Sequence, residues 1–95
     1  MGRVARPKPA RLGEKLLHIR LRLELSQTGM LKALELDGTL FHSAISGYEL
    51  GKREPPLPVL LKYARLAGVH VDDLIDDRID LPEKLRRAST RREIK

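Results

Sequence analysis

The sequence predicts a single all-α domain, and three features of the chain support this prediction. It has 95 residues, which is enough for one compact core. Its apolar residues are mainly aliphatic, and leucine recurs at the spacing of a helix face. It has no cysteine, so neither a disulfide framework nor a thiolate metal site can support the fold. The core is therefore expected to consist of aliphatic side chains on packed helices.

The first helix is expected over residues 12–24. Its apolar positions recur at steps of four, three and four residues, which places them on one helix face. These positions are Leu12, Leu16, Ile19 and Leu23. The preceding residues 1–10 combine basic side chains with Pro7 and Pro9, so we expect a disordered basic arm there.

A second helix should begin at Ser26, because serine is a good N-cap residue. It would pack through Met30, Leu31 and Leu34. A turn at Asp37-Gly38 follows, and Thr39 can cap a third helix over about residues 40–50. The apolar face of that third helix would carry Phe41, Ile45 and Tyr48. Gly51 suits the left-handed conformation that ends a helix.

The prolines at positions 55 and 56 interrupt the helical pattern, and two more helices are predicted beyond them. The fourth starts near Leu57 or Pro58 and runs to Leu66, with Gly68 ending it. Its buried side chains would be Leu57, Leu60, Leu61 and Ala64. A short fifth helix over residues 71–75, preceded or capped by His70, closes the core with Val69, Val71 and Leu74.

The ordered domain is expected to span residues 11–77, with residues 78–95 as a basic tail. Near its end lies an acidic cluster of Asp72, Asp73, Asp76 and Asp77. The cluster lacks the alternating spacing and the glycine of a calcium loop, so we expect a solvated acidic surface.

The net charge of +6 is concentrated at the two ends of the chain. Basic ends can gather phosphates by counterion release, although a purely solvated tail explains them equally well. No apolar run has the length of a signal-peptide core or a membrane span. We therefore expect a cytoplasmic protein with no membrane partner.

No enzyme site is visible in the sequence. His18, His42 and His70 are scattered without metal-ligand spacing, and neither a phosphate-binding glycine loop nor a nucleophile motif occurs. The sequence thus indicates no enzyme, no cofactor and no metal.

The most specific motif lies between residues 45 and 55. It reads Ile45-Ser46-x-x-Glu49-x-Gly51-Lys52-Arg53-x-Pro55, and a Leu-Leu-x-x-Ala helix follows at residues 60–64. Together with Ser26-Gln27, this pattern resembles the Cro/C1-type (XRE-like) helix-turn-helix family over about residues 12–75. The resemblance implies a compact five-helix, lambda-repressor-like domain with flexible basic termini. Such a domain binds double-stranded DNA and regulates transcription, as a repressor in the interpretation we favour.

The resemblance also assigns roles to individual residues. The helix at about residues 40–50 would be the recognition helix in the major groove. The expected DNA-contacting residues are Gln27, Thr39, His42, Ser43, Ser46, Gly47, Lys52 and Arg53. Gln27, Lys52 and Arg53 match phosphate-contacting positions, although a helix former and two solvated charges would look the same. Arg20 and Glu49 match a structural ion pair between the first and third helices.

The turn before the recognition helix is longer than the family's, with an insertion between Glu35 and Phe41. Two registers of the reading residues therefore stay open. Counting back from the motif gives His42, Ser43, Ser46 and Gly47, whereas counting forward from the turn adds Thr39 and Phe41. Since Gly47 has no side chain, we expect few bidentate base contacts and a larger share of affinity from phosphates and DNA shape.

Two other functions stay open. One is a protein-interaction module or antitoxin-type partner with weakened DNA binding, and the other is binding of structured RNA. A continuous positive face over Gln27, His42, Lys52 and Arg53 would indicate DNA, whereas a dominant apolar patch would indicate a protein partner. The family often binds paired half-sites as dimers, so a homodimer is also to be tested.

Overall fold

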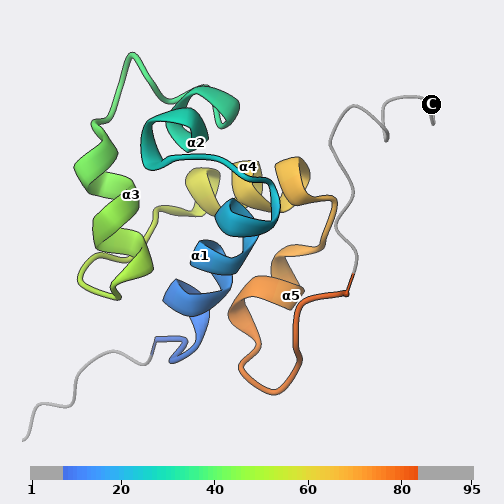
Figure 1. Ribbon diagram of the computed structural model, residues 1–95. Coiled ribbons are helices and arrows are strands. Elements are labelled where there is room, and N and C mark those ends of the chain that lie inside the picture. Colours follow the sequence, from blue (N-terminus) through green and yellow to red (C-terminus); the bar gives the residue numbers. More distant parts are fainter. Residues whose placement is uncertain (1–7, 84–95) are drawn as a thin grey trace, which may run out of the picture.

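The computed structural model describes residues 8–83, and this part of the chain contains five helices and no strand (Figure 1). The helices are α1 (Leu12–Arg22), α2 (Gln27–Ala33), α3 (His42–Glu49), α4 (Leu57–Ala67) and α5 (Val71–Ile75). The all-α, five-helix prediction is confirmed. Most of the predicted arm and of the predicted tail, residues 1–7 and 84–95, lies outside the described residues.

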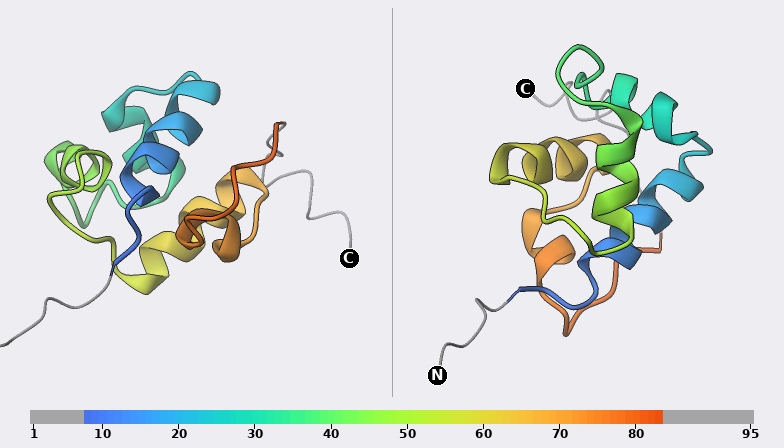
Figure 2. Two further views of the ribbon diagram at one scale, coloured as in Figure 1. Left: turned by 90° about the horizontal axis from the view of Figure 1, so that it is seen from below. Right: turned by 90° about the vertical axis from the view of Figure 1, so that its left-hand side faces the viewer.

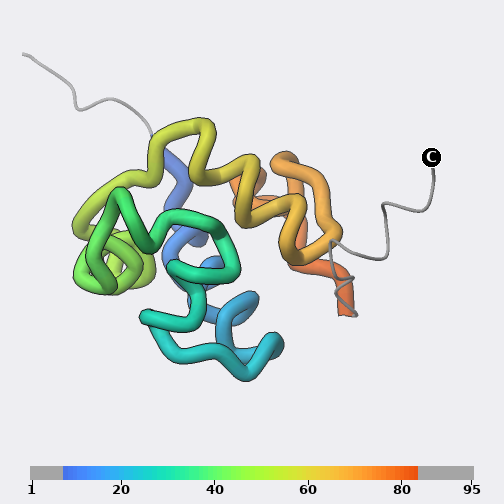
Figure 3. Tube along the Cα trace, turned by 90° about the horizontal axis from the view of Figure 1, so that it is seen from above, coloured from blue at the N-terminus to red at the C-terminus, as the bar shows by residue number. Residues whose placement is uncertain are grey.

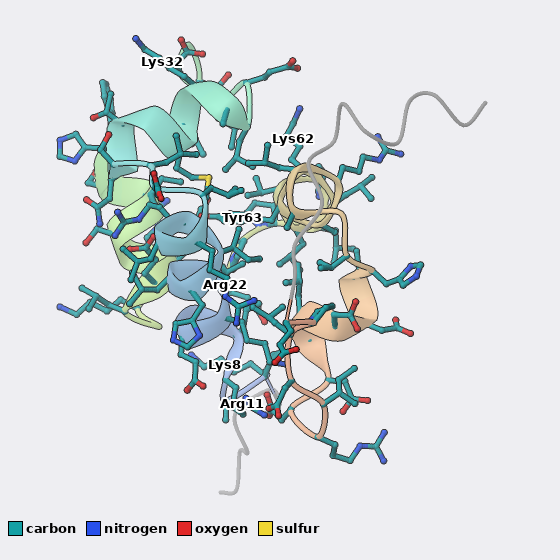
Figure 4. The ribbon with its side chains drawn as sticks, turned by 45° about the vertical axis from the view of Figure 1, so that its right-hand side comes forward. Lys8, Arg11, Arg22, Lys32, Lys62 and Tyr63 are labelled. Carbon is teal, nitrogen blue, oxygen red and sulfur yellow. The ribbon has the colours of Figure 1, made fainter. Side chains whose placement is uncertain are left out.

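Helix α1 connects the two sides of the molecule. It packs against α3 and against α5, while α2 packs on α3 and α5 on α4. As a result, α3 and α5 lie on opposite sides of α1 (Figure 1). Tyr63 of α4, which is fully buried, lies near the centre of the molecule (Figure 4). The largest other side chains that are fully buried are Lys15, Leu16, Ile19, Met30, Ile45 and Leu74.

Several helix boundaries follow directly from local signals in the sequence. The Ser26 hydroxyl oxygen accepts a hydrogen bond from the Gly29 amide at 2.9 Å, which confirms the predicted N-cap of α2. Gly51 follows α3 with a φ of 77° and Gly68 ends α4 with a φ of 72°, as expected of left-handed residues after a helix. Helix α1 ends earlier than predicted, at Arg22, because Glu24 adopts a left-handed φ of 58°.

The start of α3 differs from the prediction. The helix begins at His42, its N-cap residue is Phe41, and Thr39 does not cap it. The reason is Leu36, which is buried and whose carbonyl oxygen accepts hydrogen bonds from the amides of Thr39 at 2.9 Å and Leu40 at 2.8 Å. These bonds keep the chain in a turn through Leu40. Phe41 is consequently extended and 81% exposed, so the expectation that it packs in the core is wrong.

The buried face of α4 is also shifted from the predicted one. The residues that it buries are Val59, Leu60, Tyr63, Ala64 and Ala67. Leu57 and Leu61, which were expected in the core, are 78% and 41% exposed. Successive residues of an α-helix are rotated by about 100° around its axis, so Leu57 and Leu61 each lie about a quarter of a turn or more from the centre of the buried face. These two leucines are thus surface residues.

After α5, residues 76–83 run back along α1, and we refer to them as the C-terminal strap (Figure 2). The strap is fixed by Lys15, which is only 1% exposed. Its Nζ donates to the carbonyl oxygens of Asp73, Asp76 and Ile79, each at 2.8 Å. These three acceptors offset the cost of burying the ammonium group. The predicted domain boundary at residue 77 falls inside the strap.

Asp77 is one of the four aspartates that were predicted to form a solvated acidic surface, but its side chain is engaged in the fold. The Asp77 carboxylate accepts hydrogen bonds from the backbone amides of Ala10 at 2.8 Å and Arg11 at 2.9 Å. These bonds, the one from Ala10 first, lower the pKa of Asp77. Asp80 pairs with the Arg11 guanidinium at 2.7 Å. The carboxylates therefore join the start of α1 to the end of the domain.

Candidate nucleic-acid interface

Helix α3 has one buried face and one open face. Ala44, Ile45 and Tyr48 are buried against α1 and α2. On the open face, His42 and Ser43 are exposed, and Ser46 and Gly47 are half-buried. Figure 2 (right) shows this helix in green at the front of the molecule, with the long connection from α2 above it. The open face is therefore accessible to a large partner.

An ion pair anchors the C-terminal end of α3. The Nε atom of Arg20 lies 2.6 Å from Oε2 of Glu49, and its Nη2 atom lies 3.0 Å from Oε1. The side chains are only 14% and 5% exposed, so this two-pronged contact is largely shielded from water. The hydrogen bond to Glu49, more than any other factor, raises the pKa of Arg20. The pair fixes the orientation of α3 relative to α1.

The ion pair also holds the start of α2. Nη1 of Arg20 donates to the Leu25 carbonyl oxygen at 3.0 Å, and Nε2 of Gln27 donates to Oε1 of Glu49 at 3.3 Å. Gln27 is thus engaged by Glu49, and one of its two amide hydrogens stays available to a further acceptor. Through these contacts α1, α2 and α3 share one polar cluster.

Gly47 has a role that the sequence did not reveal. A Cβ atom there would lie 2.8 Å from Cδ of Arg53, because the Arg53 side chain lies across this position of α3. The Arg53 guanidinium also lies over the Tyr48 ring, 5.9 Å from its centre. The absence of a side chain at Gly47 therefore makes room for a cation on the open face of α3.

The close packing of α1 against α3 depends on Gly13, a glycine that no sequence motif marks. A Cβ atom at Gly13 would lie 2.7 Å from the carbonyl oxygen of Glu49 and 2.9 Å from that of Tyr48. Both neighbours are backbone atoms, so they cannot move away as a flexible side chain would. Only glycine allows this approach without a shift of one helix.

The N-terminal segment reaches the same side of the molecule. A shallow hollow beside the end of α3 is lined by Lys8, Gly13, Tyr48, Gly51 and Arg53, among others. Lys8 and Arg11 lie at the start of α1 (Figure 4). Lys8 is exposed, which adds a third cation to Lys52 and Arg53 near this end of α3.

The structure places the expected DNA-contacting residues on four consecutive segments. Gln27 starts α2, Thr39 is exposed in the turn, and Lys52 and Arg53 are exposed in the loop after α3. The remaining four residues are on α3 itself. Within residues 8–83, no group of three His, Asp or Glu side chains is arranged to hold a metal ion, and no helix has the length and apolarity to cross a membrane.

A short α2, a turn and an open α3 held against α1 define this protein as a helix-turn-helix domain of the DNA-binding kind. The comparison with known families agrees, because the sequence profile of the helix-turn-helix family of the Cro/C1 type (XRE-like) matches residues 18–74. The chain belongs to this family of DNA-binding regulators. Neither a curated protein nor a solved structure matches the chain.

Proposed function

We propose that this protein is a sequence-specific, repressor-like transcriptional regulator that inserts α3 into the major groove of double-stranded DNA. The observation that carries the proposal is the open face of α3, flanked by the exposed Lys52 and by Arg53, which lies across Gly47. An α-helix fits the major groove, and cations beside it can hold the phosphates on either side.

The roles of the side chains follow from their positions. His42 and Ser43, exposed in the first turn of α3, are the main candidates for base contacts, with Thr39 and Ser46 beside them. Gly47 contributes by leaving space for Arg53. Lys52 and Arg53 would bind phosphate oxygens, and Gln27 would use its free amide hydrogen for another.

The decisive experiment is selection of binding sites from a random pool of double-stranded DNA. We expect an enriched sequence, with each mismatched base pair costing about 1–3 kcal/mol of binding free energy. Replacement of Ser43 by alanine should change the preferred sequence while leaving non-specific binding intact. A pool that yields no enriched sequence with the native chain would refute specific regulation.

A second candidate function, contact with another protein, is favoured by a different observation. Leu57, Leu61 and Ile75 expose 78%, 41% and 41% of their surfaces, and an apolar groove runs beside Leu57 and Ile75. Such side chains are typical of a protein contact. We propose a homodimer as the first partner to test, by sedimentation velocity over a range of concentrations. Two half-sites in the selected DNA, one helical turn apart, would support the dimer, and a concentration-independent monomer would exclude it.

A further inference from the structure

Phe41 is the most exposed large apolar side chain among residues 8–83, at 81% of its surface. It is also the N-cap residue of α3, with an extended backbone at φ −106° and ψ 163°, and its side chain forms no capping hydrogen bond. Helices favour Ser, Thr, Asp or Asn at this position, because the side-chain oxygen of these residues accepts a hydrogen bond from the first turn. The sequence thus places a large ring in water where a small polar residue would stabilise the helix.

The backbone around Phe41 is held in place although the ring is not packed. Leu36 is buried and Leu40 packs against the core. The turn between them is closed by hydrogen bonds to the Leu36 carbonyl oxygen, and the Phe41 carbonyl oxygen accepts one from Ala44 at 2.9 Å. Figure 3 traces this connection in green between α2 and α3. The long turn therefore presents Phe41 from a fixed backbone position at the start of α3.

The start of α3 is the end that matters for reading bases. In helix-turn-helix complexes, residues at the N-terminal end of the recognition helix contact base edges in the major groove. Phe41 directly precedes His42 and Ser43, the proposed base-reading residues. Side chains at a helix start point toward its N-terminus, so a residue there projects ahead of the helix.

The major groove of DNA contains one type of group that is suited to contact with an apolar ring. The C5-methyl group of thymine is the apolar feature that the major groove offers for recognition. We propose that Phe41 is a specificity-determining residue that packs its ring against a thymine methyl group beside the bases read by His42 and Ser43. This inference rests on the proposed function, and it adds a preference that the short side chains of Ser43 and Ser46 do not supply.

The experiment removes single methyl groups from the DNA. Each thymine of the site selected by the native chain is replaced in turn by deoxyuridine, which lacks only the C5-methyl. We expect one thymine per bound domain at which this change weakens native binding about three- to tenfold, as for a small apolar contact. The Phe41→Ala variant should bind the unmodified site more weakly and should be insensitive to deoxyuridine at that position, whereas Phe41→Leu should retain part of the sensitivity.

The matched control is Ile79→Ala, which removes a partly exposed apolar side chain from the strap, on the other side of α1 from α3 and outside the groove proposed for the dimer. It should keep the full deoxyuridine effect. The inference is overturned if every deoxyuridine substitution weakens binding of the Phe41→Ala and Phe41→Leu variants by the same factor as it weakens binding of the native chain. It is also overturned if Phe41→Ala leaves DNA binding unchanged and abolishes self-association instead. Failure of the native chain to select any site would refute the proposed function itself, which is a separate result.

Discussion

At Gly13 the backbones of α1 and α3 approach so closely that one added carbon would meet two carbonyl oxygens. We expect Gly13→Ala to lower the free energy of unfolding by about 1–3 kcal/mol, because the overpacking cost exceeds the gain of up to about 1 kcal/mol in helix propensity. Chemical denaturation measures the change.

The matched control for Gly13→Ala is Gly47→Ala, which adds the same carbon to another helical glycine. There the neighbour is the side chain of Arg53, which can rotate away. The cost of displacing Arg53 and the gain in helix propensity should largely cancel, so the stability should change by no more than about 0.5 kcal/mol. Equal losses in the two variants would mean that helix packing at Gly13 is not the cause.

The Tyr63 hydroxyl oxygen is buried and has no hydrogen-bond partner among residues 8–83. Its burial raises the pKa of Tyr63. A buried polar group without a partner costs about 1–3 kcal/mol, so Tyr63→Phe should be as stable as the native chain or more stable. Thermal unfolding tests this expectation, and a clearly lower melting temperature would indicate a partner that residues 8–83 do not supply.

Among the polar contacts between helices, the ion pair of Arg20 with Glu49 should be the one whose loss lowers the stability most. Arg20→Met leaves the nearly buried Glu49 carboxylate without its counter-charge, which should cost about 3–5 kcal/mol of stability. The double variant Arg20→Met/Glu49→Leu should lose less than the sum of the single variants, with a coupling of about 0.5–3 kcal/mol. Strict additivity in this double-mutant cycle would show that the pair does not contribute as a unit.

The junction of α1 with the strap should make stability depend on pH. Because folding lowers the pKa of Asp77, its contribution is present above the ordinary carboxyl pKa and is lost as the pH falls through the lowered one. The melting temperature should therefore fall between about pH 5 and pH 3. The Asp77→Asn variant should be less stable than the native chain at pH 7, and its melting temperature should fall less on acidification. Part of the pH dependence should remain in the variant, because the pKa values of Asp76 and Asp80 are also lowered. Parallel curves for the two proteins would contradict a role for Asp77.

The elements themselves could be predicted from the sequence, because apolar spacing, Ser26 and the helix-ending glycines are local signals. The exposure of Phe41 could not, since it depends on the turn that the buried Leu36 closes before α3. The exposure of Leu57 could not either, since several apolar faces are possible on α4 and tertiary packing selects the one that is buried. The burial of Lys15 was equally hidden, because its acceptors lie 58 to 64 positions further along the chain.

For the candidate site, the family motif supplied Arg20 and Glu49, and these two side chains are in contact in the structure. The same motif placed the recognition helix, and it identified Gly47 as a position without a reading side chain. It gave no reason for that glycine, since the packing of Arg53 across α3 is a contact between a helix and a loop. Spacing along a sequence does not encode such a contact.

Across the whole molecule, α3 with its adjoining loop lies on one side of α1, and α5 with the strap lies on the other. This division predicts which cations set the salt dependence of DNA binding. Replacing Lys52 and Arg53 with alanine should weaken binding to all sequences and reduce the slope of log K against log salt by about two units.

The matched control for that titration replaces two cations of α4, Lys62 and Arg65, with alanine. The change in charge is the same, but these residues lie outside the proposed interface, and Lys62 projects from α4 away from α3 (Figure 4). Their loss should leave the slope nearly unchanged. An unaltered slope in the Lys52/Arg53 variant would eliminate the phosphate contacts assigned to that loop.

The strap also decides where this domain can be trimmed or fused to another protein. A chain ending at Asp76 would lack the Ile79 carbonyl oxygen that Lys15 uses and the Asp77 carboxylate that holds the first amides before α1. The ammonium group would then stay buried with one acceptor fewer, and the start of α1 would lose its attachment. Further along the strap, Nη1 of Arg22 donates to the carbonyl oxygens of Pro82 at 2.7 Å and Glu83 at 3.2 Å. A minimal expression unit should therefore extend at least to Glu83, and a shortened fragment that binds DNA poorly would reflect damage to the scaffold and not the removal of a contact.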